Sequence, residues 1–239
     1  GDLMKHYFVD FETRSEADLK KVGAEHYARH ESTKILCLAF LLSTDDEPDI
    51  WYPGQPLPKK LIRHAENGAI FHAYNAAFEH NIWNNKLVEH GFPRIEIPSW
   101  RCTMARCSYA ALARSLEGAA KCLGLTNEKD MEGKRIMMKM CKPRKPLKAE
   151  KDAEDYDPKK VLWHDDPDEY TKLYDYCKQD VIVEREVYKN TPAIPQYEQD
   201  LWALDQKINQ KGFPVDLELA QAAIDSHKLY VDKLVPELV

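Results

Sequence analysis

The sequence predicts an α/β protein built on a mixed β-sheet flanked by helices, with a helical extension at its C-terminal end. Strand-like segments come first, strands then alternate with helices, and helices follow, an order that fits a mixed sheet better than a purely parallel one. Residues 35–42 (ILCLAFLL) form a continuous apolar run, typical of a strand buried on both faces. The chain has 239 residues, enough to bury such a core without disulfides or a structural metal.

Short segments rich in aromatic and β-branched residues predict the strands. The first segment, KHYFVD, has this composition, and turn residues such as Asp46 and Pro48 separate the later ones. The predicted strands cover residues 5–10, 35–42, 50–52 and 69–74.

Cap and stop residues predict the helices. Gly68 and Gly124 end helical segments, and Ser115 is placed to cap one. Residues 14–28 are expected to be partly helical, and residues 152–168 to form a loop. The remaining predicted helices cover residues 57–66, 78–90, 104–113, 116–123, 167–188, 201–211 and 217–235.

Charge and hydropathy exclude two classes of protein. With 34 basic and 40 acidic residues the chain carries a net charge of −6, which argues against coating duplex DNA through a broad basic face. Cations in a carboxylate site can still supply local positive charge, so the negative net charge is compatible with an enzyme that acts on nucleic acid. The longest apolar run is far shorter than the roughly 20 residues of a membrane helix, so no membrane partner is expected.

One segment is strongly basic against this acidic background. Either it guides a nucleic-acid strand, or it is an ordinary solvated loop. Its basic residues are Lys134, Arg135, Lys139, Lys142, Arg144, Lys145, Lys148 and Lys151.

Paired carboxylates mark the first predicted strand. Asp10 and Glu12 end it as D-F-E, and residues i and i+2 of a strand point to one face while Phe11 points to the other, toward a core. Adjacent carboxylates repel unless a cation lies between them, and hard divalent cations such as Mg²⁺ take oxygen ligands of this kind. Taken alone, the pair is also explained by an exposed acidic strand end.

Two further acidic positions lie in predicted helices. Glu79 falls at a helix N-terminus, where the helix dipole favours acids in any protein. Tyr176 and Asp180 are four residues apart and share one helix face, which Val183 and Val187 continue. Because that face should turn inward, a carboxylate there is costly unless it is paired or metal-bound.

Taken together, D-x-E, N-x-x-F-E and Y-x-x-x-D in this order resemble the three motifs of the DEDD 3′→5′ exonucleases. Tyr176 matches their tyrosine branch, because the position where the other branch carries histidine is Asp175. The resemblance covers roughly residues 5–189. This part of the chain is similar to the proofreading domain of phage-type family A DNA polymerases. The segments that carry it are residues 10–21 (DFETRSEADLKK), 27–28, 115–125 (SLEGAAKCLGL) and 176–180.

The resemblance implies a ribonuclease H-like fold and two domains. Residues 1–192 would form the 3′→5′ exonuclease domain, and residues 193–239 a helical linker and the start of a truncated polymerase body. The segment between Asp205 and Asp216 looks like the junction where such a body begins, although by its residues it is also an ordinary helical hairpin. Palm and finger sections would be missing, so no polymerase activity is expected from this fragment.

The resemblance also implies roles for individual residues. Asp10 would bridge two divalent cations, Mg²⁺ or Mn²⁺, with Glu12 and Asp180 completing the first site and Glu79 supporting the second. Tyr176 would orient the attacking water, since a phenol with a pKa near 10 is a poor base at neutral pH. The positions that contact the terminal nucleotides in the family are Thr13, Asn75 and Phe78, although Phe78 is equally explained by core packing.

Two departures from the family pattern concern neighbouring residues. Glu79 stands where the family usually has Asp, and its extra methylene moves the carboxylate by more than an ångström. Phe78 stands where Tyr is common, so a phenol hydrogen bond is absent. The first departure bears on the geometry of the second cation.

The implied activity is removal of nucleoside 5′-monophosphates from single-stranded or frayed DNA 3′ ends, in the cytoplasm of a bacterial or phage-infected cell. Two alternatives stay open. One is an RNA 3′ exonuclease of the ribonuclease D type, which the junction at residues 205–216 disfavours. The other is a catalytically silent binding module with the exonuclease fold, which Glu79 keeps open.

Overall fold

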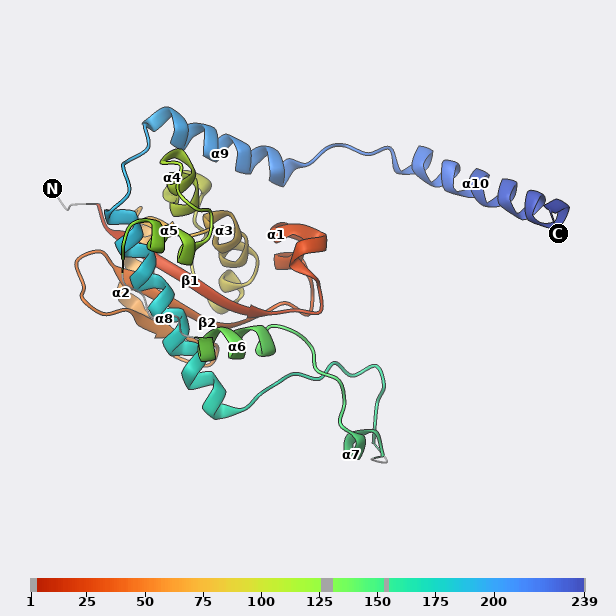
Figure 1. Ribbon diagram of the computed structural model, residues 1–239, viewed down its shortest axis with the longest axis horizontal. Helices are drawn as coiled ribbons and strands as arrows, with labels where there is room; N and C mark the ends of the chain where they lie inside the picture. Colours follow the sequence, from red (N-terminus) through yellow and green to blue (C-terminus); the bar gives the residue numbers. More distant parts are fainter. Residues whose placement is uncertain (1–3, 126–130, 153–154, 239) are drawn as a thin grey trace. The chain divides into compact units, whose positions relative to one another are not determined.

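The computed structural model describes residues 4–125, 131–152 and 155–238 of the chain (Figure 1). It divides into two compact units, Gly1–Gln206 and Lys207–Val239. The first unit contains the whole sheet, and the second contains the end of helix α9 (Gln196–Lys211) and helix α10 (Leu217–Leu238). The domain boundary expected at residue 192 stays a prediction, because compactness alone does not mark where a functional domain ends.

The sheet has five strands in the order β3-β2-β1-β4-β5. β1 pairs antiparallel with β2 and parallel with β4, so the predicted mixed α/β sheet is confirmed, while its ribonuclease H-like identity stays a prediction. The outer pairs follow the same pattern, antiparallel between β2 and β3 and parallel between β4 and β5. The strands are β1 (His6–Arg14), β2 (Lys34–Leu42), β3 (Asp49–Trp51), β4 (Ile70–Ala73) and β5 (Trp100–Cys102).

Helices lie between these strands and after them in the chain. They are α1 (Leu19–Arg29), α2 (Lys59–Glu66), α3 (Ala76–Asn85), α4 (Thr103–Tyr109), α5 (Leu116–Cys122), α6 (Met131–Met140), α7 (Lys148–Lys151), α8 (Pro167–Lys189), α9 and α10, with 3-10 turns η1 (Leu87–His90) and η2 (Ile97–Ser99). Among the described residues no helix is long and apolar enough to cross a membrane.

Three sequence expectations are corrected by the structure. β1 continues to Arg14, four residues beyond its expected end, so Asp10 and Glu12 lie inside the strand. The short strand β5 was not expected, and it forms because Trp100 packs against Phe71 with ring centroids 5.5 Å apart. Helix α6 occupies the start of the basic segment, where Ile136 and Met140 are buried. Residues 153 and 154 of the expected loop lie outside the described residues.

The two faces of the sheet bury separate clusters. On one face the rings of Phe11 and Trp83 meet edge to face with centroids 6.2 Å apart, so the core-facing position expected for Phe11 is confirmed. On the other face Cys177 and Val181 of α8 pack against Phe8 of β1, and α8 crosses the sheet there (Figure 1). The run at residues 35–42 is buried throughout, as its continuous apolar pattern predicts.

Helix α8 begins at its proline. Pro167 occupies the first turn, where its missing N–H costs nothing, and the Asp166 side chain accepts a hydrogen bond from the Asp168 N–H at 3.0 Å. Val183 and Val187 lie in a cluster with Cys107 of α4 and Ala119 of α5. This packing sets how α8 is turned about its axis, and therefore which of its polar side chains meet β1.

Candidate active site

Two carboxylates of β1 face helix α8. Asp10 pairs with Ala39 of β2 and Glu12 with Cys37, and the register shifts directly after Glu12. The Cys177 thiol of α8 donates to Asp10 Oδ2 at 3.3 Å and to the Asp10 carbonyl at 3.5 Å. These contacts hold helix α8 against β1 at Asp10.

Burial changes the charge state of this pair. It raises the pKa of Asp10 to about 8, with the Asp180 carboxylate adding to the rise and the Cys177 thiol opposing it. Burial is also the main cause that places the pKa of Glu12 well above its ordinary value, with repulsion from Asp10 next. In the absence of a cation, these carboxylates are costly to ionise.

Helix α8 adds a phenol and a carboxylate to the same place. Burial raises the pKa of Tyr176 far above its ordinary value, helped by the charges of Asp180, Glu12 and Asp10 and by a hydrogen bond to Asp180. The phenol is therefore protonated at any physiological pH. The helix face with Tyr176 and Asp180 was expected to point inward, and both side chains are partly buried.

Glu79 joins this group from α3. Its side chain is only 5% exposed, although it lies in the first turn of the helix. Burial, followed by the charges of Asp10 and Glu184, raises its pKa well above the ordinary range. Its Oε2 atom is buried and has no hydrogen-bond partner among the described residues.

Glu184 is a member of the group that the sequence interpretation missed. It is 2% exposed, accepts a hydrogen bond from Thr103 Oγ1 at 2.7 Å, and has a pKa raised well above the ordinary value by burial, then by Asp10 and Asp180. The signal was present, since Tyr176, Asp180 and Glu184 follow one another at intervals of four on one helix face. The extended motif therefore reads Y-x-x-x-D-x-x-x-E.

We expect Thr103→Val to lower the free energy of unfolding by about 1–3 kcal/mol, because it leaves Glu184 Oε1 buried without its donor. Thr103→Ser keeps the hydroxyl and is the matched control, expected to stay close to the wild type in urea unfolding. Equal stability of the valine variant and the wild type would show that Glu184 does not depend on this hydrogen bond.

The three predicted nucleotide-contacting residues differ in their surroundings. Thr13 is buried, and its Oγ1 lies 2.9 Å from the Tyr27 hydroxyl. Phe78 is partly buried against the Tyr27 ring, with centroids 5.9 Å apart. Asn75 is exposed at the N-cap position of α3, where its side chain makes no capping hydrogen bond, and it lines a cavity of about 540 Å³ with Met104.

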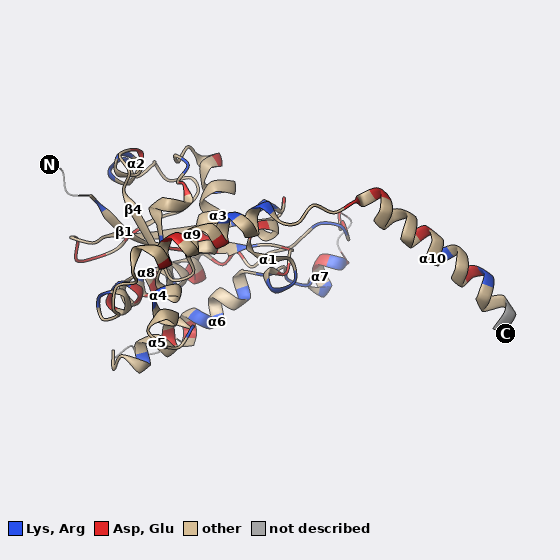
Figure 2. Cartoon of the chain, turned by 90° about the horizontal axis from the view of Figure 1, so that it is seen from above, with Lys and Arg blue, Asp and Glu red and all other residues tan. Residues whose placement is uncertain are grey.

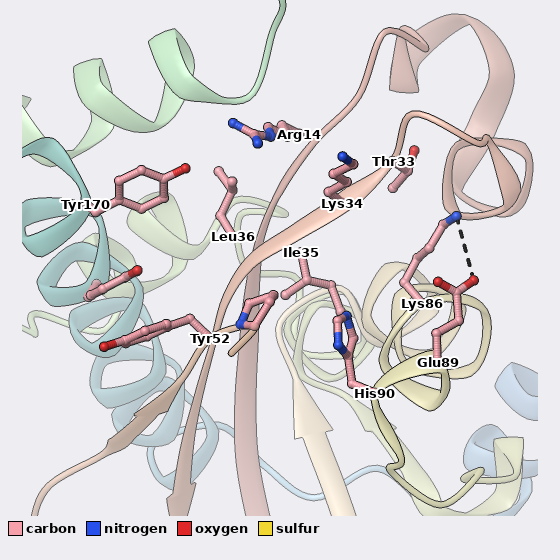
Figure 3. Close-up of a pocket in the computed structure, with 12 residues that line it drawn as sticks. Arg14, Thr33, Lys34, Ile35, Leu36, Tyr52, Lys86, Glu89, His90 and Tyr170 are labelled. Atoms are coloured by element: carbon pink, nitrogen blue, oxygen red, sulfur yellow. Dashed lines mark ion pairs between the residues drawn. The ribbon is translucent and has the colours of Figure 1, made fainter. Parts of the chain in front are cut away.

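A second cavity, of about 480 Å³, opens at the edge of β2 (Figure 3). Arg14 and Lys34 lie in the upper part of this view, and Tyr52 lies below them. Lys86 and Glu89, 4.0 Å apart, form an ion pair at its rim. None of the acidic residues of the site lines this cavity, so it is a separate hollow that reaches the end of β1 through Arg14.

The donor set fits a hard divalent cation. One oxygen each of Asp10 and Glu12 and the Cys177 sulfur lie within 4.8 Å of one another. Burial keeps the thiol protonated by raising the pKa of Cys177 well above its ordinary value, so the carboxylates are the better ligands for Mg²⁺ or Mn²⁺. Within the described ranges no Lys, Arg or His forms an ion pair with Asp10, Glu12, Glu79 or Glu184.

Fold and site thus define an α/β protein with a buried carboxylate cluster, in which Asp10, Glu12, Glu79 and Glu184 form no ion pair with a basic side chain of the described residues. The chain is 34% identical over 242 residues to the DNA polymerase of Bacillus phage SP02, and the match takes in 98% of this chain. It spans 35% of the length of that polymerase. No family model matches the sequence. The chain is therefore related to a phage DNA polymerase, which confirms the predicted relationship to such enzymes. Its assignment to their proofreading domain stays a prediction.

Proposed function

We propose that this chain is a divalent-cation-dependent 3′→5′ exodeoxyribonuclease, the proofreading part of a phage-type DNA polymerase. The observation that carries the proposal is the clustering of acids from three elements. The Asp180 carboxylate of α8 raises the pKa of Asp10 on β1, and Asp10 in turn raises the pKa of Glu12 on β1 and of Glu79 on α3. The relationship to a phage DNA polymerase supports DNA rather than RNA as the substrate.

The acidic residues divide between two cation positions in this proposal. Asp10, Glu12 and Asp180 would hold the first Mg²⁺ or Mn²⁺, and Asp10 and Glu79 the second. The orphaned Oε2 of Glu79 supports this division, because a buried carboxylate oxygen without a donor is satisfied by a cation. When bound, the cations would neutralise charge on the phosphoryl oxygens and align the attacking and leaving oxygens.

The protein side chains orient the reactants. The Tyr176 hydroxyl donates a hydrogen bond to Asp180, which leaves a phenol lone pair to accept a hydrogen bond from the attacking water. Because its pKa is raised, Tyr176 positions the water and does not remove its proton. Phe78, braced by Tyr27, offers a ring on which the last base stacks without sequence preference. The products are nucleoside 5′-monophosphates.

The direct test is digestion of a 5′-labelled DNA strand. We expect a ladder that shortens from the 3′ end, requires Mg²⁺ or Mn²⁺, and releases nucleoside 5′-monophosphates. The same strand annealed in a blunt duplex should be cut more slowly, since its end must fray. Unchanged cutting in excess chelator would exclude the cation-dependent mechanism. Faster cutting of RNA than of DNA would favour the ribonuclease alternative.

Variants of Glu79 distinguish an active exonuclease from a catalytically silent module. The reason is that Glu79 carries one methylene more than the Asp that is usual in the family at this position. We expect the wild type to digest DNA and Glu79→Gln to lose roughly tenfold or more in rate, since the second cation would lose a charged ligand. Glu79→Asp keeps the charge and is the matched comparison. A wild type without activity that gains it in Glu79→Asp would identify the chain as a module silenced by that methylene.

A further inference from the structure

A small hollow lies at the connection between α8 and α9. Figure 2 shows α4, α8 and α9 close together, and residues of all three helices and of β5 line the hollow, whose volume is about 110 Å³. None of the acidic residues of the candidate site lines it. We call this hollow the arginine pocket, and its polar lining residues are Arg101 of β5, Arg106 of α4, Tyr188 of α8, and Gln196 and Gln199 of α9.

Backbone carbonyls hold both arginines in place. Arg101 Nη1 donates to two carbonyls close to it in sequence, at 2.7 and 2.8 Å. Arg106 Nε donates to the Thr191 carbonyl at 3.0 Å, its Nη2 donates to the same oxygen, and its guanidinium carbon lies 3.9 Å from the centre of the Tyr188 ring. These contacts fix the two guanidinium planes and leave further N–H groups on each, since an arginine has five.

The two arginine charges have no carboxylate beside them. Neither guanidinium forms an ion pair with an Asp or Glu of residues 4–125, 131–152 and 155–238. Burial lowers the pKa of Arg101, and Asp200, which opposes this fall, is exposed and accepts a hydrogen bond from Gln196 Nε2 at 2.8 Å. Burial also lowers the pKa of His72 well below its ordinary value, and both arginines add to that fall. Because a half-buried cation without a partner is costly, a bound anion would stabilise this place.

The dimensions and donors of the arginine pocket select the class of anion. Its volume of about 110 Å³ is below the roughly 300–1,000 Å³ of pockets that enclose a whole drug-sized ligand, and above the roughly 30 Å³ that one water takes. It therefore suits a single tetrahedral group. Guanidinium forks match the oxygens of phosphate, and the first turn of α9 adds the partial positive charge of a helix N-terminus.

The arginine pocket adjoins the larger cavity of about 540 Å³ described above. Cys102 and Ile194 line both hollows, so the two are neighbours. The larger cavity is also lined by Asn75, the N-cap residue of α3, and α3 carries Glu79. A chain of hollows thus runs from the arginines to the helix that contributes to the acidic cluster.

We propose that the arginine pocket binds a phosphate group. A backbone phosphate of a DNA strand and the 5′-phosphate of a released nucleotide offer this same chemistry. Binding of phosphate itself is independent of the proposed function, whereas either source rests on it. In both cases the larger cavity would connect the bound phosphate with the acidic cluster.

The test is NMR titration of the full chain with inorganic phosphate in chelator, followed on the Arg106 Nε–H signal. We expect saturable binding by the wild type and about tenfold weaker binding by Arg101→Gln, because at least one charge-assisted hydrogen bond is lost. Arg101→Lys keeps the charge without the planar fork and should lose less. Arg101→Gln keeps the bonds from Arg106 to Thr191, and urea unfolding checks that it folds.

Arg94→Gln is the matched control, since it removes one positive charge from an exposed arginine between η1 and η2. It should bind phosphate like the wild type. Absence of saturable phosphate binding by the wild type, or an equal loss in Arg101→Gln and Arg94→Gln, would overturn the inference.

Titration with thymidine 5′-monophosphate and with an oligothymidylate distinguishes the two sources. A loss in Arg101→Gln confined to the oligothymidylate identifies a backbone phosphate as the ligand, and a loss confined to the monophosphate identifies the released nucleotide. Failure of the proposed function would show differently, as absence of cation-dependent digestion while inorganic phosphate still binds.

Discussion

Replacing Asp10 by Asn is expected to remove the proposed exonuclease activity while stabilising the metal-free protein. The substitution takes away the carboxylate shared by both proposed cation positions, and the lost charge stabilisation of several kcal/mol corresponds to a rate reduction of about 10³-fold or more. In the metal-free protein the same carboxylate is a buried charge with a pKa raised to about 8, so its removal relieves repulsion with Asp180. We expect a gain of about 1 kcal/mol or more in unfolding free energy above neutral pH.

Asp175→Asn is the matched control for this prediction. Asp175 lies on the same helix, but its side chain is 67% exposed and 3.1 Å from the Lys178 ammonium group. Such a surface pair contributes little, so rate and stability should stay near those of the wild type. The measurements are the initial digestion rate and urea unfolding in chelator. Loss of both activity and stability in Asp10→Asn would mean that Asp10 is a structural residue, contrary to the proposal.

Stability without divalent cations is expected to fall as the pH rises, and added Mg²⁺ or Mn²⁺ should reverse the trend. The folded pKa of Asp10 is about 8 against an ordinary value of 3.8, and Glu12, Glu79 and Glu184 are raised in the same direction. Between these pH values the folded state holds more protons than the unfolded state, so unfolding free energy decreases with pH. The loss should amount to several kcal/mol across the window, since each pKa unit corresponds to about 1.4 kcal/mol.

Cations should act most strongly at the upper end of this window, where the carboxylates are easiest to ionise. A cation at a hundred times its Kd stabilises by about 2.7 kcal/mol, and each kcal/mol raises Tm by about 2–4 °C in a chain of this size. Thermal unfolding at several pH values, with and without the cation, measures both effects. A metal-free Tm that rises steadily from about pH 4 to about pH 8, or a cation effect unchanged in Asp10→Asn, would contradict the clustered arrangement.

Local patterns account for much of the sheet. The run at residues 35–42 was predicted as a strand buried on both faces, because every one of its residues is apolar and its length is typical of a strand. Strand β5 could not be found this way, because three residues are too few to show a period and its place depends on the Trp100 and Phe71 rings. Helix α6 was hidden because its charges obscured the buried spacing of Ile136 and Met140.

The candidate site was also predictable only in part from local spacing. The two-residue spacing of Asp10 and Glu12 and the four-residue spacing of Tyr176 and Asp180 each determine a shared face, since strand and helix geometry are local. Glu184 has the same spacing and was missed because a glutamate at the end of a helical stripe is common on solvated faces. Only its 2% exposure and its bond to Thr103 distinguish it from such a residue.

By itself, the amino-acid sequence determined which short segments are strands and helices, which carboxylates share a face, and that the chain is related to a phage DNA polymerase. Only the tertiary structure decided that β1, α3 and α8 bring their acids together, and that β1 extends far enough to contain two of them. The reason is physical: side-chain spacing acts over one helical turn or two strand residues, whereas Asp10 and Asp180 meet through the packing of Cys177 and Val181 against the sheet. That packing depends on the whole core at once.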